Sequence, residues 1–250
     1  MNNQASEEQQ SKIKAISHLD TLVKLSGLAV FATAAFVYFG YQVTRSYFQS
    51  IGAPWALDLL TTNALILSAL PLTGSFLFAI IAGLIWAKRC PKRSWIIGFT
   101  VICLAIAAVA ISVVIFFEKA RVVTVAGQTF FFAYALAISG ASAEVAHDLN
   151  NGKGFSSSVI STVYYFSFFV IFLAPINYGQ ILARIDCDWT SSPLAVIPLQ
   201  DAPNEQWRLV RVLADKALLV RLTPQEVDRE FRIVATDKVR AHYTKFAFSK

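Results

Sequence analysis

Long stretches of this chain contain no Asp, Glu, Lys or Arg, and they constrain the fold more than any other feature. A helix needs about 20 mostly apolar residues to cross the hydrocarbon core of a bilayer. The chain is 56% hydrophobic and 15% charged, whereas a soluble domain has about 25% charged residues. Five uncharged windows therefore predict membrane-spanning helices: Leu25 to Thr44, Leu59 to Ala87, Ser94 to Phe117, Val122 to Ala143 and Gly154 to Ala183.

Neither a soluble helical core nor a cleaved signal peptide fits these windows as well. Core helices of a soluble protein keep a polar face, and these windows have no charged stripe. The first window is longer than the apolar part of a cleaved signal peptide, which is usually about 7–15 residues, and Tyr47-Phe48 is a poor cleavage site. Because Gln128 and small polar residues dilute the window Val122 to Ala143, we predict five transmembrane helices, or four if residues 122–143 do not cross.

The charge pattern predicts an orientation in the membrane. The segment "AKRCPKRSW" at residues 87–95 places four basic residues in one short loop. Basic loops stay on the cytoplasmic side of a membrane. The N-terminus is then cytoplasmic as well, and residues 44–58 face outward. With five spans, residues 184–250 lie outside, and with four they lie in the cytoplasm.

The residues on either side of the predicted spans form two further segments. Residues 1–24 are polar and have the pattern of a short amphipathic helix on the membrane surface. In residues 184–250, "WRLVRVL" (207–213) and "ALLVRL" (217–222) read as a β-hairpin, with further strands at 194–199, 231–235 and 239–243. This antiparallel β domain is too small to be stable alone, so we expect it to pack on the membrane domain of residues 25–183 or on a partner.

An aromatic stretch follows the first window. Tyr47, Phe48 and Trp55, together with Arg45, bracket the predicted outer loop. Tyr and Trp gather at the headgroup level of a bilayer, so the stretch has the composition of a membrane exit. The same residue types form the hot spots of protein interfaces, so we also predict these four residues as a partner-binding surface. The two interpretations are compatible.

The sequence resembles small bacterial polytopic membrane proteins of unassigned function. The resemblance rests on "YFGYQVTRSYFQSIGAPW" (38–55), where paired tyrosines, Tyr-Phe and a Gly follow the first span. It also rests on "ASAEVAHDLNNGKG" (141–154) before the last span, and on the strand-rich tail from Trp207 to Tyr243. It implies an architecture, and no activity or catalytic residues. We separately predict a bacterial inner (cytoplasmic) membrane location, and with five spans the C-terminal domain lies in the periplasm.

Few residues carry candidate chemistry. Glu144 and His147 are three residues apart, hence on one helical face, and an acid beside a His in a membrane domain can relay protons. They can also simply mark the interfacial end of a helix before Asn150. No nucleotide-binding, metalloprotease or hydrolase motif is present, and the three cysteines have no metal-site spacing. We therefore expect no metal, no cofactor and no nucleic acid, despite the net charge of +6.

Small residues and prolines in the spans predict how the helices pack. Ala79, Gly83 and Ala87 repeat at four-residue spacing, which lets two backbones approach closely and favours a homo-oligomer through this stripe. Pro71 is expected to kink its span without breaking it. Pro175 is expected to bend the last span near its end, at an interface.

Two classes of function remain. The first is a membrane-anchored interaction protein that presents the aromatic loop and the β domain to a protein partner, as immunity proteins against bacterial toxins do. The second is a subunit of a small oligomeric transporter or channel. Transporters usually have several ionisable residues within their spans, and this sequence has almost none there, which favours the first class. An enzyme is not expected, because no nucleophile, base or metal constellation is visible.

Overall fold

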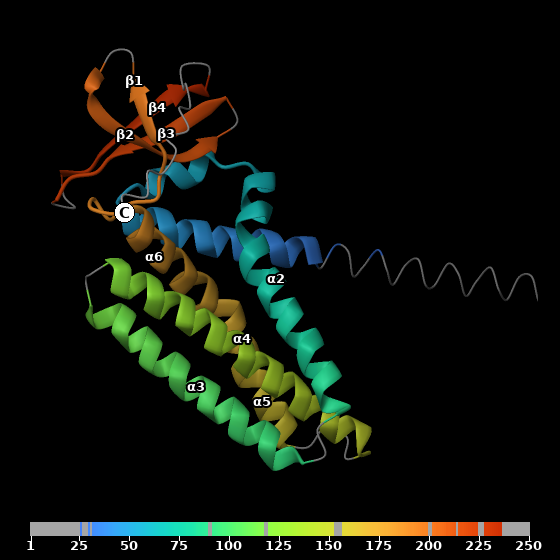
Figure 1. Ribbon diagram of the computed structural model, residues 1–250. Helices are drawn as coiled ribbons and strands as arrows, with labels where there is room; N and C mark the ends of the chain where they lie inside the picture. The colour runs from blue at the N-terminus through green and yellow to red at the C-terminus, as the bar shows by residue number, and fades with distance from the viewer. Residues whose placement is uncertain are drawn as a thin grey trace, which may run out of the picture.

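The computed structural model describes residues 26, 30, 32–89, 92–117, 120–152, 157–199, 202–213, 215–224 and 228–236. The amphipathic segment predicted at residues 1–24 and the strand predicted at 239–243 lie outside this part of the chain. Helices run as far as Asp186, and the strands follow them (Figure 1). The fold is therefore mostly helical with a small antiparallel sheet, as the sequence predicts.

The order of elements is simple. An N-terminal helix covers residues 32–51. The other helical elements are the 3-10 helix η1 (Pro54–Leu59), α2 (Thr62–Ala87), α3 (Arg93–Phe116), α4 (Ala120–Asn150), α5 (Ser157–Phe168), the π-helix η2 (Phe169–Leu173) and α6 (Ala174–Asp186). The strands are β1 (Val196–Leu199), β2 (Ala202–Leu213), β3 (Lys216–Arg221) and β4 (Glu230–Ala235).

Four helical stretches in the described part of the chain are long and apolar enough to cross a membrane. Their outward side chains are large and apolar, and Phe78 is 75% and Phe116 81% exposed. Soluble proteins rarely expose such large apolar surfaces, whereas lipid chains would cover them. The four stretches are Thr62–Ala87, Arg93–Phe116, Val122–Asn150 and Val159–Asp186.

Two of the sequence predictions can be compared with these stretches. The diluted window Val122 to Ala143 does form a helix of spanning length. The first window, Leu25 to Thr44, is described only in part, so its crossing, and with it the count of five, stays a prediction.

The sheet and the basic loop lie at opposite ends of the helical bundle. The turn from α2 to α3 and the connection from α4 to α5 share one end, and the sheet sits at the other, beyond the ends of α6 and the N-terminal helix (Figure 1). The basic residues Lys88, Arg89, Lys92 and Arg93 lie between α2 and α3 or at the start of α3, at the end of the bundle away from the sheet. The bundle therefore separates these positive charges from the sheet.

Helix α4 is the centre of the bundle and packs against α2, α3, α5 and α6. The small-residue stripe of α2 faces α4: Ala79 and Ala87 are buried, and a Cβ on Gly83 would lie 2.2 Å from the carbonyl oxygen of Ser139. Close packing within the chain thus already uses this stripe, and a homo-oligomer through Ala79, Gly83 and Ala87 stays a prediction.

The close approach at Gly83 gives a direct test of the α2–α4 contact. We expect Gly83→Ala to destabilise the protein by about 1–3 kcal/mol, because the added methyl group would overpack a backbone contact. Gly74→Ala on the same helix is the matched control, since nothing in the described part of the chain lies within 4 Å of a Cβ at that position. Thermal unfolding in detergent measures both; equal melting temperatures for the two variants would contradict this packing.

Neither proline breaks its span. Helix α2 continues through Pro71 as a single α-helix. Before Pro175 the last span changes to the π-helix η2, and the N–H of Ala174 donates to the carbonyl of Phe169, five residues back. A proline has no N–H and crowds the preceding turn, and a π turn is one way to accommodate it. Pro175 lies inside the span Val159–Asp186 and is buried.

The sheet is an antiparallel meander in the order β1-β2-β3-β4. The predicted hairpin is confirmed: β2 pairs with β3 from Leu213 opposite Lys216 to Trp207 opposite Arg221. The register shifts between Leu209 and Arg211, which marks a β-bulge in β2. Strand β3 is buried from Ala217 to Val220, so both of its faces are covered.

Candidate functional site at the helix–sheet junction

The aromatic stretch after the first window is mostly helix, not loop. The N-terminal helix continues to Ile51 and ends at Gly52, whose φ of 91° suits a glycine at a helix terminus. Phe48 and Ile51 face the sheet and are 0% and 1% exposed. Phe48 therefore cannot belong to an exposed partner-binding patch, and this prediction is corrected: helical spacing turns its ring inward, against the β domain.

One apolar cluster joins the helices to the sheet. Its buried members come from the N-terminal helix and the following loop, from the end of α6, and from β2 and β3. They are Phe48, Ile51, Ala53, Ala56, Ala183, Cys187, Leu213 and Leu218. The expectation that the small sheet packs on the membrane domain is thereby confirmed.

Two polar contacts hold the N-terminal helix to α6 beside this cluster. The Tyr47 hydroxyl donates to Asp186 Oδ2 at 2.9 Å, and the Ser46 hydroxyl donates to the carbonyl of Ile176 at 2.7 Å. Burial, with the nearby charge of Asp186, raises the pKa of Tyr47 far above its ordinary value. Tyr47 thus acts as a neutral hydrogen-bond donor, which a buried carboxyl group requires.

The bulge in β2 brings a charged side chain to the same junction. Residues directly opposite in a ladder point to the same face, and the shifted register places Arg211 opposite the buried Leu218. Arg211 Nη2 donates to Ser68 Oγ of α2 at 2.9 Å. Burial lowers the pKa of Arg211 below its ordinary value, and the nearby carboxylate of Asp186 offsets part of this effect. Strand β2 is thereby tied to α2 as well as to α6.

An apolar surface remains exposed at the edge of this junction. The ring of Trp55 meets that of Phe231 edge-on, with centroids 6.3 Å apart. Phe231 and Ile233 alternate on β4 and lie opposite Val220 and Leu218, so both point to the helix-facing side. Trp55 is 42% and Ile233 41% exposed. We call Trp55, Phe231 and Ile233 the Trp55 surface.

The four residues predicted as one partner-binding patch do not form one surface. Phe48 is buried, and Tyr47 is half-buried against Asp186. Arg45 is exposed and lines a small cavity of about 390 Å³ with Gln49 and Gln180. Only Trp55 is both exposed and part of an apolar surface. Sequence reasoning missed Phe231 and Ile233, because it read them only as members of a strand.

The predicted polar pair lies at the opposite end of the bundle. Arg93, the first residue of α3, binds Glu144 Oε1 at 2.6 Å and Asp148 Oδ2 at 3.3 Å. His147 Nδ1 is 3.7 Å from Asp148 Oδ1. Glu144 thus forms a salt bridge that joins the start of α3 to the end of α4. No group of three or more His, Cys, Asp and Glu side chains suited to a metal ion occurs in the part of the chain that was described.

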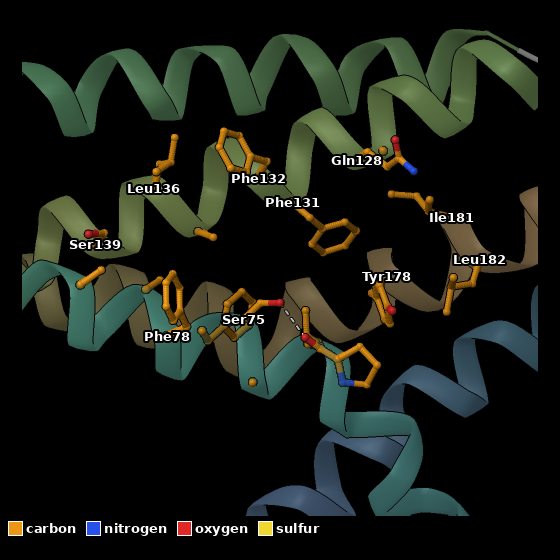
Figure 2. Close-up of a pocket in the computed structure, with 18 of the residues that line it drawn as sticks. Ser75, Phe78, Gln128, Phe131, Phe132, Leu136, Ser139, Tyr178, Ile181 and Leu182 are labelled. Atoms are coloured by element: carbon orange, nitrogen blue, oxygen red, sulfur yellow. Dashed lines mark hydrogen bonds between the residues drawn. The ribbon is translucent and has the colours of Figure 1, made fainter.

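A groove of about 890 Å³ runs along α4 between α2 and α6 (Figure 2). Phe131 and Phe132 reach into it from α4, and Tyr178 and Ile181 from α6, while Gln128 carries its largest polar group. None of the described residues that line it is charged. Such a lining suits an apolar occupant.

Comparison of the chain with models of protein families, with curated proteins and with solved structures finds no match. No family is therefore assigned, and the resemblance carried by residues 38–55 and 141–154 stays a prediction.

The hydrogen bond between Tyr47 and Asp186 can be tested by itself. We expect Tyr47→Phe to destabilise the protein by about 1–3 kcal/mol, because it leaves a buried carboxyl group without its donor. Tyr41→Phe is the control, since Tyr41 is an exposed tyrosine of the same helix. The measurement is thermal unfolding, combined with limited proteolysis between α6 and β1. Unchanged stability and unchanged cleavage in Tyr47→Phe would show that this bond does not hold the junction.

Proposed function

We propose that this protein is a membrane-anchored interaction protein that binds a protein partner through the Trp55 surface and the adjacent sheet. The observation that carries the proposal is the Trp55 surface at the sheet end of the bundle, in which Trp55 and Ile233 are exposed and Phe231 is partly buried. Large aromatic side chains that are partly exposed and well supported are typical hot spots of protein interfaces. The lipid-facing surface of the helices lies apart from this surface.

The structure around the Trp55 surface supports this role. The Phe48 cluster and the hydrogen bond from Arg211 to Ser68 fix the sheet to three helical elements. The hydrogen bond from Tyr47 to Asp186 joins two of these elements, the N-terminal helix and α6. A surface held in this way loses little conformational freedom on binding, which favours affinity. Among the described strands, β4 pairs only with β3.

The charge pattern supports an orientation for this surface. The basic residues at 88–93 and the sheet lie at opposite ends of the bundle. Since basic loops stay in the cytoplasm, the sheet and the Trp55 surface face the outside. In a bacterial inner membrane that side is the periplasm, where an immunity-type protein would meet a toxin.

Labelling of single cysteines tests the orientation. In a chain with its native cysteines replaced, we expect Lys216→Cys to react with a membrane-impermeant maleimide in intact cells. Lys88→Cys is expected to react only after permeabilisation. Both positions are exposed and lie at opposite ends of the molecule. The reverse pattern would place the sheet in the cytoplasm.

Site-specific photocrosslinking tests the partner surface. A photoreactive residue at Trp55 or Ile233 is expected to capture a discrete protein in cells, whereas one at Val212 is not. Val212 is the matched control because it is 52% exposed and pairs with Ala217, on the other face of the sheet. Trp55→Ala should then weaken co-purification of the captured protein about tenfold or more, at unchanged membrane abundance. Equal crosslinking at Val212, or none at Trp55 and Ile233, would refute the proposed surface.

The alternative function is a subunit of an oligomeric transporter or channel. One observation favours it, because the π-helix at Phe169–Leu173 packs beside Tyr134, a buried tyrosine whose hydroxyl has no hydrogen-bond partner among the described residues, and π turns are frequent at functional sites. The apolar groove and the salt bridges of Arg93 with Glu144 and Asp148 favour the interaction protein instead. Flux of a solute through liposomes containing the pure protein would reverse this preference.

A further inference from the structure

The groove of Figure 2 has its two largest polar side chains toward one end. Gln128 lies in the third turn of α4, and Tyr178 lies eight residues before the end of α6 at Asp186. Helix α4 begins at the sheet end of the bundle and α6 ends there (Figure 1), so both side chains lie toward the sheet end of the groove. The hydroxyl of Ser75, in contrast, already donates to the carbonyl of Pro71 at 2.7 Å.

The amide of Gln128 and the hydroxyl of Tyr178 make no hydrogen bond within the described part of the chain. Both residues belong to helical stretches of spanning length, Val122–Asn150 and Val159–Asp186. At 1.5 Å per residue they lie about 9–12 Å inside the sheet-side ends of these stretches. Water is scarce at that depth in a bilayer, and a polar group without a partner is costly there. The groove therefore holds two polar groups that a ligand can satisfy.

Aromatic rings line the groove on both sides. Phe131 of α4 meets Tyr178 of α6 edge-on, with ring centroids 5.1 Å apart. Phe132 of α4 and Phe78 of α2 stand on opposite sides of the groove in Figure 2, and they are 69% and 75% exposed. Such rings keep a second helix, which is about 10–12 Å across, away from the floor of the groove. A slim molecule can pass between them, and a flat ring packs well against aromatic side chains.

The size and charge of the groove limit the class of ligand. Its volume of about 890 Å³ falls in the range of about 300–1,000 Å³ that is typical of small-molecule sites. The segments that line it, residues 71–82, 127–139 and 178–185, are described throughout, and none of the lining residues is charged. A charged headgroup would lose its hydration there without meeting an opposite charge. The ligand is therefore neutral, and carbonyl oxygens are the acceptors that an amide N–H and a hydroxyl fit.

We propose that this groove binds a neutral, lipid-soluble molecule with a carbonyl-bearing ring and an apolar tail, the chemistry of an isoprenoid quinone. The Gln128 amide and the Tyr178 hydroxyl donate to the carbonyl oxygens of the ring. The tail runs away from the sheet, between Phe78 and Phe132. The groove is separate from the proposed partner surface, so failure of either proposal leaves the other intact.

Thermal unfolding of the full chain in detergent tests the ligand class. A fully substituted benzoquinone with a decyl tail is expected to raise the melting temperature more than decylbenzene, which has no carbonyl group. Gln128→Leu should weaken the apparent affinity for this quinone about tenfold or more and leave the decylbenzene effect unchanged. Thr129→Val is the matched control, because Thr129 borders a different cavity and donates to the carbonyl of Val125. It should leave the quinone effect intact.

Native mass spectrometry provides the second measurement, because it counts both bound quinone and copies of the chain. One quinone per chain is expected for the unaltered protein and for Thr129→Val, and less for Gln128→Leu and for Tyr178→Phe. Equal effects of the quinone and decylbenzene, or an undiminished quinone effect in Gln128→Leu, would overturn the proposal. Displacement of the quinone by an equal concentration of phosphatidylcholine would make the groove an ordinary acyl-chain site and overturn it as well. A dimer that is lost in Gln128→Leu, with no quinone bound, would assign the groove to a second copy.

Discussion

Burial of Phe48 and Ile51 against Leu218 is the interaction on which the arrangement of this molecule depends. A four-stranded sheet of this size buries too little apolar surface to be stable alone. The sheet therefore needs an apolar surface on the helices. The C-terminal ends of the N-terminal helix and of α6 provide this apolar surface, and the sheet covers both.

The same burial imposes polar requirements that the chain meets locally. Tyr47 satisfies Asp186, and Arg211 reaches Ser68 because the β-bulge turns it to the helix-facing side. A regular β2 would place Val210 opposite Leu218 and turn Arg211 to the other face. The bulge therefore decides whether the sheet can be tied to α2, which fits the general use of bulges to redirect one side chain.

Charged side chains have different surroundings at the two ends of the bundle. At the end with the basic loop, Arg93 forms salt bridges with Glu144 and Asp148, and these hold α3 against α4. At the sheet end, Arg184 and Arg229 border an open cavity, and Trp55 stands exposed beside β4. The proposed partner surface belongs to this second end. The groove along α4 differs from both ends, since its described lining carries no charge.

Local patterns in the sequence were sufficient to predict the elements themselves. Uncharged windows of spanning length and the alternating runs at 207–213 and 217–222 predicted the helices and the hairpin, because hydrophobic periodicity and turn residues act over a few positions. The β domain was also correctly expected to need a surface to pack on. What each side chain contacts was not predictable in this way. Phe48 and Trp55 are both aromatic residues of the same stretch of sequence, yet Phe48 is buried and Trp55 is exposed.

Contacts between distant segments account for what the sequence did not predict. The stripe at Ala79, Gly83 and Ala87 suits any close helix, and only the fold shows that α4 of the same chain occupies it. Arg93 and Glu144 are 51 residues apart, so their pairing depends on how α3 and α4 cross. The sequence alone determined where helices and strands form, because those preferences are local. The tertiary structure decided which faces are buried, which charges pair and which aromatic residues remain exposed, because these depend on packing between segments that no local pattern encodes.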